Sequence, residues 1–473
     1  MRQTPTASTG RLDGADALAP AGSLRTRLAG LLRRGVGGGA RRMALSTFAI
    51  RIVGAGLAYL SQILMARWMG AHDYGVFSVV WTLVMILGLF ACLGFSASPN
   101  RFVPEYAGDP ALLRGYLHSS RLIAVGAASL LALLGFAGIW LLRPVIDPVY
   151  VVPAYLAMLA LPVFTLVGVQ DGIARSYDWP ALAMLPTYIW RPLTLLALLS
   201  AAMLLGYQIG ATAAAAAAVA ATWAVGLYQL LKLNGNLRGR VPPGPRRFQI
   251  QHWLAISLPM LLVEGFLQLI TSADVIMVSF WRPPDEVGVY FAASKTLALV
   301  HFVYFAVRAA SAHRFSSLYR DGDPAALDAY VRMATRWTFW PSLAGGVLLL
   351  ALGPFLLRLF GAGFEAGYPL IAVLLVGVLA RASVGPADAL LSMSGHQKSC
   401  AGIYAGVFGL NVVLNVALIP MFGLIGAALA TAAAIFFEAV ALSLASRRKL
   451  GVTPFILASA PVGGAPGHGA PGR

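Results

Sequence analysis

About twelve apolar stretches of roughly 20 residues follow one another along this chain, and they constrain its fold more than any other feature. An α-helix of that length crosses the hydrocarbon core of a bilayer, which is ~30 Å thick. Only 11% of the residues are charged, whereas soluble globular domains carry about 25%. We therefore predict an all-α integral membrane protein with twelve transmembrane helices.

The distribution of basic residues predicts the orientation of these helices. Most of the 35 Lys and Arg residues lie in the two tails and in every second loop, and the alternate loops hold few of them. Because an excess of Lys and Arg marks the cytoplasmic loops of membrane proteins, both termini are expected in the cytoplasm. The basic residues of the tails and cytoplasmic loops account for the net charge of +17, so this charge does not indicate a nucleic-acid partner.

Changes in composition divide the chain into five predicted segments. Between the two tails we expect two six-helix lobes joined by a basic cytoplasmic linker. Leucines at helical spacing between arginines in 24–34 fit either a helix that lies on the membrane surface or a disordered basic tail. The predicted segments are a basic cytoplasmic tail over 1–43, the first lobe over 44–232, the linker over 233–252, the second lobe over 253–446, and a cytoplasmic tail over 447–473 with a Pro/Gly-rich end.

The two predicted lobes repeat parts of one another. The segment Gly-Val-Phe at 75–77 follows a tryptophan and an acidic residue, and the segment Gly-Val-Tyr at 288–290 does so at matching spacing. Asp171 and Asp388 recur at nearly the same offset. An even number of spans in each half makes the repeats parallel, as in transporters that bind substrate between two bundles and work by alternating access. Chance similarity between apolar helices is the alternative interpretation.

Five cations lie inside predicted spans, and they are the candidate substrate-binding residues. A charged side chain at the centre of a bilayer costs at least about 2.5–3.5 kcal/mol, so such a residue usually faces a watery cavity or a partner. Arginine suits a phosphate ligand because it stays charged and presents a planar fork of donors. Alternatively, Arg51 could snorkel to the interface or pair with an acid on another helix, and Arg308 could be an interfacial anchor. Lys295 could pair with Asp274. The five cations are Arg51, Arg191, Lys295, Arg308 and Arg381.

Three acidic residues inside spans, Glu264, Asp274 and Glu438, are candidate sites of ion coupling. Each could bind a proton or a cation, or could form a structural ion pair with one of the basic residues. Glu264 and Asp274 lie on one predicted helix roughly 80° apart, which would let them share one wall. No cluster of His, Cys and carboxylates has the spacing of metal ligands, and no phosphate-binding loop occurs. We expect no metal, no cofactor and no nucleotide hydrolysis.

Four passages of the sequence are similar to one family. They are residues 66–77, residues 101–106, Asp274 together with 287–290, and a passage within 395–431. In these passages the chain resembles the polysaccharide-transport family of the multidrug/oligosaccharidyl-lipid/polysaccharide exporter superfamily, the Wzx-type flippases. The resemblance covers about residues 40–446.

This resemblance implies a MATE-like fold in which two six-helix lobes form a central cavity. It implies movement of an undecaprenyl-pyrophosphate-linked oligosaccharide, such as an O-antigen, capsule or exopolysaccharide repeat unit, from the inner to the outer leaflet of the cell inner membrane. The implied partners are membrane lipids, a polysaccharide polymerase and a chain-length regulator. No enzymatic activity is implied. Lipid II flippases of the superfamily have two further spans, which counts against lipid II as the substrate.

Two other functions are compatible with part of the sequence. A MATE-like drug or metabolite antiporter driven by H⁺ or Na⁺ would need carboxylates at the centre of its cavity and few arginines deep in the membrane. This chain has both carboxylates and arginines within its predicted spans. A membrane enzyme such as an O-antigen polymerase or ligase would need a large periplasmic loop with polar catalytic groups. Every predicted outer loop is short. We therefore expect a flippase rather than an enzyme.

Overall fold

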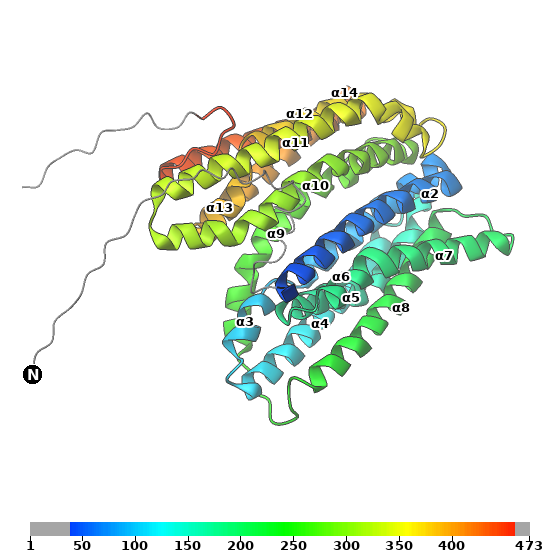
Figure 1. The fold of residues 1–473 in the computed structure, drawn as a ribbon. Helices are drawn as coiled ribbons and strands as arrows, with labels where there is room; N and C mark the ends of the chain where they lie inside the picture. The colour runs from blue at the N-terminus through cyan, green and yellow to red at the C-terminus, as the bar shows by residue number, and fades with distance from the viewer. Residues whose placement is uncertain (1–37, 459–473) are drawn as a thin grey trace, which may run out of the picture. The chain divides into compact units, whose positions relative to one another are not determined.

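The computed structural model describes residues 38–458, with side chains described from residue 49 onward, and the elements in this range are helices (Figure 1). The predicted surface helix over 24–34 lies outside the described residues. The chain divides into the units Met1–Ser46 and Thr47–Arg473, and all packing below is within the second unit. In chain order the elements are α2 (Gly38–Ala91), α3 (Pro99–Glu105), α4 (Pro110–Leu142), α5 (Pro148–Ser176), α6 (Pro180–Leu185), the π-helical turn η1 (Pro186–Trp190), α7 (Arg191–Leu204), α8 (Ala211–Arg238), α9 (Ile250–Ser279), α10 (Pro284–Asp321), α11 (Pro324–Arg358), the 3-10 turn η2 (Phe364–Gly367), α12 (Tyr368–Ser383), α13 (Ala387–Met393) and α14 (Gln397–Leu450).

The prediction of twelve membrane-spanning helices is confirmed. Among the described residues, ten helical segments are long and apolar enough to cross a membrane. Two of them, α2 and α14, each contain a glycine with non-helical geometry, Gly70 with φ of 77° and Gly423 with φ of 59°. Because a positive φ interrupts a right-handed helix, α2 and α14 each provide two consecutive spans. The span Pro180–Leu204 combines α6, η1 and α7.

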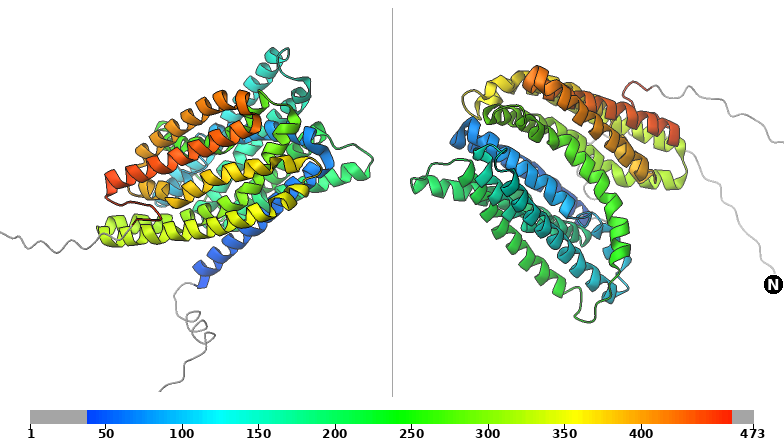
Figure 2. Two further views of the ribbon diagram at one scale, coloured as in Figure 1. Left: turned by 90° about the horizontal axis from the view of Figure 1, so that it is seen from above. Right: turned by 180° about the vertical axis from the view of Figure 1, so that it is seen from behind.

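The spans form two lobes, which Figure 2 shows from two further sides. In the first lobe, α5 packs on α4 and α8, α7 packs on α8, and the part of α2 that follows Gly70 packs on α4 and α5. In the second lobe, α10, α11, α12 and α14 pack on one another, and α9 packs on α14. The chain between the lobes is not helical over residues 239–249.

Helix α9 contacts both lobes. Near its start, Trp253 is fully buried in the first lobe and donates a hydrogen bond from its indole nitrogen to Tyr106 Oη over 3.1 Å. One turn later, the carbonyl group of Ser257 lies so close to Gly94 that any Cβ there would clash, and Gly94 has a φ of +81°. The far end of α9, including Val275, is buried with residues of α10 and α12. Figures 1 and 2 show α9 running from the side of α3 toward the second lobe.

The lobes meet where the repeated Gly-Val-aromatic segments lie. A Cβ at Gly75 would clash with the carbonyl oxygen of Pro284, and a Cβ at Gly288 would clash with the carbonyl oxygen of Ala71. Ala71 and Pro284 occupy equivalent positions in the two repeats, and so do Gly75 and Gly288. The contact is therefore the same from both sides, as at an interface between two copies related by a two-fold axis. We call these four residues the seam.

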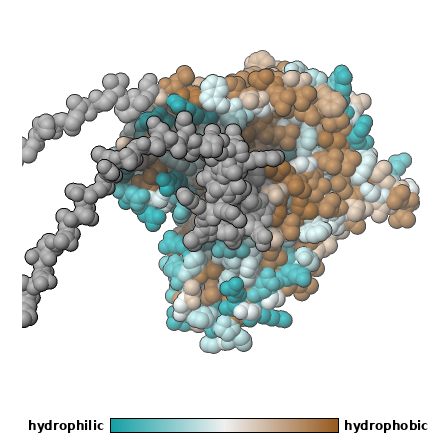
Figure 3. All heavy atoms as spheres, in the orientation of Figure 1, coloured by the Kyte–Doolittle hydropathy of each residue, from teal (hydrophilic) through white to brown (hydrophobic). Residues whose placement is uncertain are grey.

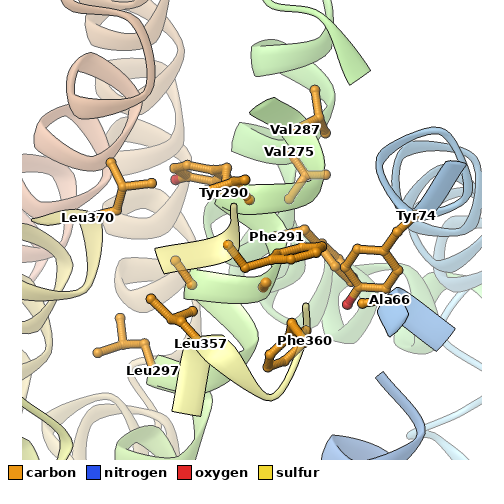
Figure 4. Packing of buried hydrophobic residues seen from close by; sticks show 14 of the residues in the cluster. Ala66, Tyr74, Val275, Val287, Tyr290, Phe291, Leu297, Leu357, Phe360 and Leu370 are labelled. Atoms are coloured by element: carbon orange, nitrogen blue, oxygen red, sulfur yellow. The ribbon is translucent and has the colours of Figure 1, made fainter. Parts of the chain in front are cut away.

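Aromatic side chains close the structure beside the seam. The ring of Tyr74 has no exposed surface and lies 5.7 Å from the ring of Phe291 and 6.4 Å from that of Phe360, measured between centroids (Figure 4). The hydroxyl groups of Tyr59 on α2 and Thr296 on α10 share a hydrogen bond of 3.1 Å. The two lobes are thus in tight contact at this end of the spans.

Large apolar side chains also point outward along the helices. Leu133 and Trp140 of α4 are 66% and 71% exposed, and Trp337 of α11 is 63% exposed. Soluble monomers rarely expose extended apolar surface of this kind. Figure 3 shows hydrophobic residues over much of the visible face and hydrophilic residues gathered toward its ends. This distribution is typical of a helical protein that is surrounded by lipid.

Candidate functional site

Arg191 lies in the first lobe, at a distortion of its span. The π-helical turn Pro186–Trp190 directly precedes it, and such turns are frequent at functional sites. The guanidinium carbon of Arg191 lies 5.4 Å from the centre of the Phe164 ring. Arg191 lines a cavity of about 210 Å³ together with Gln62 and Tyr188. No carboxylate in the described part of the chain lies within 4.0 Å of its guanidinium group, so no direct ion pair cancels its charge.

Asp171 of α5 contacts the same span as Arg191, because it accepts a hydrogen bond from Thr187, one turn before Arg191. Asp171 is 8% exposed and accepts hydrogen bonds from Gln229 Nε2 at 2.6 Å and from Thr187 Oγ1 at 3.0 Å. Both donors are neutral. Asp171 is therefore held in place without an arginine in contact with it, and the guanidinium group of Arg191 stays available to another anion.

Arg51 and Lys295 also form no ion pair with any carboxylate that the structure describes. Arg51 is exposed on the first part of α2. Lys295 is half-buried on α10, and its Nζ lies 4.6 Å from the centre of the Phe291 ring. An aromatic face at that distance partly stabilises the charge of an ammonium group. No ion pair within 4.0 Å joins Lys295 to Asp274, whose carboxylate accepts hydrogen bonds from Tyr290 and Thr431.

Arg308 and Arg381, by contrast, are both neutralised by acids. Arg308 Nε lies 2.5 Å from Asp388 Oδ2, and the arginine side chain is 34% exposed. Arg381 forms a two-point ion pair with Glu438, in which Nε and Oε1 are 3.1 Å apart. Their side chains are 1% and 0% exposed. The predicted substrate-binding residue Arg381 and the predicted coupling residue Glu438 thus form one buried pair.

These two ion pairs belong to one polar network inside the second lobe. Tyr304 Oη donates a hydrogen bond to Asp388 over 2.7 Å, and the Arg381 guanidinium carbon lies 5.7 Å from the centre of the Tyr304 ring. Asp388 is the repeat counterpart of Asp171. An arginine therefore contacts the acid in the second lobe, whereas neutral donors hold its counterpart in the first lobe. The repeat drew attention to both acids, but the sequence did not predict their partners.

Asp274 is the centre of a second buried network. It is 3% exposed and accepts hydrogen bonds from Tyr290 Oη at 2.6 Å and from Thr431 Oγ1 at 3.4 Å. Asn411 Nδ2 donates to Thr431 Oγ1, and Asn415 donates to Asn411. A carboxylate, hydroxyls and amides from α9, α10 and both parts of α14 thus meet inside the second lobe. Within the described residues, no group of three or more His, Cys, Asp and Glu side chains could hold a metal ion.

Glu264 has different surroundings from Asp274, although both lie on α9. The side chain of Glu264 is exposed. Asp274 is enclosed within the second lobe. The two acids therefore have different surroundings, although they lie on the same helix: Glu264 is exposed and Asp274 is buried.

Residues 40–317 match the model of a family described as polysaccharide biosynthesis protein. The chain belongs to this family. Residues 259–417 also match the MatE family. The comparison with curated proteins found no match.

Solved structures of transporters share the fold. An inward-facing multidrug resistance MATE transporter of the MOP superfamily is 14% identical with a TM-score of 0.69, covering 84% of this chain and 94% of that one. The lipid II flippase MurJ in an inward closed conformation is 14% identical with a TM-score of 0.66, covering 85% and 87%. A MOP superfamily transporter from Pyrococcus furiosus is 14% identical with a TM-score of 0.63, covering 86% and 95%.

The predicted fold class and superfamily are therefore confirmed. The protein is a multi-pass membrane protein of the polysaccharide biosynthesis family with a MATE-like fold of two six-helix lobes. The structural neighbours named above are transporters and a flippase, and their likeness to this chain is one of fold.

Proposed function

We propose that this family member moves an undecaprenyl-pyrophosphate-linked oligosaccharide from the inner to the outer leaflet of the cell inner membrane by alternating access. The observation that carries the proposal is Arg191, a cation within a membrane span that has no described acid in direct contact and lines a cavity with both polar and apolar side chains. Transferring phosphate charge through hydrocarbon costs many kcal/mol. A fixed guanidinium group in a wet cavity removes much of that cost, because it donates a planar pair of hydrogen bonds to phosphate oxygens.

The surroundings of the five candidate cations separate them into two groups. Arg191, Arg51 and Lys295 have no direct ion pair among the described residues, and we assign substrate contact to them. Arg308 and Arg381 have acid partners, so their first role is to hold the second lobe together. These cations would contact the charged head group of the substrate. The glycan would occupy the space between the lobes, and the lipid tail would stay in the surrounding lipid.

Alternating access requires one end of the lobes to close while the other opens. The close backbone contact at the seam and the aromatic contacts of Tyr74 support a closed state of that end. If the loops follow the positive-inside rule, the seam lies on the periplasmic side and both termini lie in the cytoplasm. Opening of the seam would then release the head group to the outer leaflet, where a polysaccharide polymerase and a chain-length regulator would act on it.

The test is a flipping assay with a fluorescent undecaprenyl-pyrophosphate oligosaccharide in proteoliposomes. Arg191→Ala should lower the initial flipping rate by about 10- to 100-fold, because a charge-assisted hydrogen bond contributes about 1.5–3 kcal/mol. Arg191→Lys should restore part of the rate, since it keeps the charge but loses the fork. Arg143→Ala removes an exposed arginine beyond the end of α4 and should have no effect. Wild-type flipping by Arg191→Ala would refute the assignment.

The match of residues 259–417 to the MatE family supports a second candidate, a drug or metabolite antiporter driven by H⁺ or Na⁺. Measurements in the same vesicles can distinguish the two functions. Uptake of a cationic dye that depends on an imposed ion gradient, without any flipping of the lipid-linked oligosaccharide, would favour the antiporter. Flipping without dye uptake would favour the flippase.

A further inference from the structure

The two parts of α14 form a groove at the end of the membrane span where this helix both begins and ends. Ser399 and Ile403 from the first part and Ala441, Leu444, Ala445, Arg448 and Lys449 from the second part line a cavity of about 350 Å³. Neither wall belongs to the seam, to the Arg191 cavity or to the Asp274 network. The groove therefore needs an explanation that is independent of the proposed transport function.

One end of the groove is cationic. Arg448 and Lys449 are exposed in the last turn of α14, and no described carboxylate forms an ion pair with either of them. Basic residues at the end of a helix interact favourably with its dipole, and this would account for three consecutive basic residues without any ligand. However, Arg447 is also exposed in the same turn and does not line the groove. Arg447 is therefore a control: it experiences the same helix dipole as Arg448 and Lys449 but is not part of the groove.

The other part of the groove is apolar and shallow. Ala441 and Ala445 are one helical turn apart and leave room above them, and Leu444 is 48% exposed beside them. Ile403 forms the opposite wall. On the neighbouring face of the first part of α14, Gly402 and Gly406 are exposed and would have nothing within 4 Å of an added Cβ. The walls thus offer a path for a hydrocarbon chain that begins at the basic residues and leads toward the membrane centre.

The geometry points to a binding site for an anionic phospholipid in this groove. The phosphate would lie at Arg448 and Lys449, with the hydroxyl group of Ser399 as a further donor, and one acyl chain would lie between Ile403 and Leu444. Basic pockets between transmembrane helices at the membrane surface are typical sites for anionic head groups. The apolar walls favour a lipid over a soluble phosphate, because a free anion would leave them exposed to water.

The test compares binding of phosphatidylglycerol and phosphatidylethanolamine to the purified full-length protein in mixed micelles, by native mass spectrometry. The double variant Arg448→Gln/Lys449→Gln should bind phosphatidylglycerol roughly 25-fold more weakly, at about fivefold for each basic residue near the membrane surface. Binding of phosphatidylethanolamine should change little. The matched control Arg447→Gln should bind phosphatidylglycerol as the wild type does.

A second variant tests the apolar part without changing any charge. Ala445→Phe fills the groove, and it should weaken binding of phosphatidylglycerol while leaving the melting temperature of the protein unchanged. An equal loss of binding in Arg447→Gln and in the double variant would overturn the proposal, because it would indicate surface charge alone. Undiminished binding in Ala445→Phe, or equal competition by soluble glycerol phosphate, would also overturn it.

Discussion

Arg191 and Arg381 are both arginines within membrane spans, yet their surroundings differ. Glu438 neutralises Arg381 in a pair that has almost no exposed surface. The neighbour of Arg191, Asp171, is instead satisfied by the amide of Gln229 and a hydroxyl group. A buried cation with a partner stabilises one arrangement of helices, whereas a cation without one can bind a ligand. The partner, more than the arginine itself, therefore decides the role.

Removing one member of the buried pair should destabilise the protein. Glu438→Gln leaves the guanidinium group of Arg381 buried without a counter-charge, which costs about 3–5 kcal/mol. We expect a clearly lower melting temperature of the purified protein in detergent. The double variant Arg381→Met/Glu438→Leu removes both charges and should recover most of the loss. A wild-type melting temperature for Glu438→Gln would show that the pair does not hold α12 and α14 together.

The sequence predicted which charged residues lie in the membrane, but it did not predict which of them meet. Span length and hydropathy located Arg381 and Glu438, because these depend only on neighbouring residues. Their contact depends on how α12 packs against α14, and a local pattern carries no information on that. The repeat of Asp171 and Asp388 was a usable signal for the network around Tyr304. It did not reveal that an arginine contacts only one of the two acids.

Among the helices, α2 and α10 form the contact between the lobes at the seam. Their Gly-Val-aromatic segments were recognisable in the sequence as a repeat, and the structure explains why glycine occurs at 75 and 288. At each position the backbone of the other lobe occupies the place of a side chain. The repeated glycines that indicated a parallel duplication are therefore the residues that the close backbone contact requires. The clash of each glycine with the opposite backbone could not be foreseen without the packing.

A larger side chain in the seam should keep this end of the lobes apart. In Gly75→Val the new Cβ atom would overlap the Pro284 carbonyl group, so the closed contact cannot form. Spin labels at Leu204→Cys and Met421→Cys, both exposed and on different lobes, should report a longer mean distance than in the wild type. Gly138→Val is the control, because a Cβ there meets nothing within 4 Å. An unchanged distance distribution in Gly75→Val would contradict a role of the seam in closure.

In the molecule as a whole, α9 is the helix that can relate events in the two lobes. Its first turns are fixed in the first lobe by Trp253, its middle carries the exposed Glu264, and its last third places Asp274 in the interior of the second lobe. A change in the charge of the Asp274 network would therefore act on a helix that both lobes hold. This arrangement makes Asp274 the strongest of the three candidate coupling residues.

Asp274→Asn should separate transport from its driving force. The amide keeps the size of the carboxylate but lacks its negative charge, so it cannot bind a proton or a cation in the same way. Flipping should therefore no longer respond to an imposed H⁺ or Na⁺ gradient. The rate without a gradient should remain within about threefold of the wild type, a difference below 1 kcal/mol. Asp321→Asn changes an exposed acid at the end of α10 and is the control. A full gradient response in Asp274→Asn would exclude this residue as the coupling site.

The seam has a consequence for the origin of the molecule. Since Ala71 and Gly75 on one side meet Pro284 and Gly288 on the other in the same way, an ancestor with half as many helices could have assembled with a second copy of itself through this motif alone. Fusion of two such genes would then have freed each half to evolve separately. The different partners of the two equivalent acids, an arginine at Asp388 and a glutamine amide at Asp171, would result from that divergence.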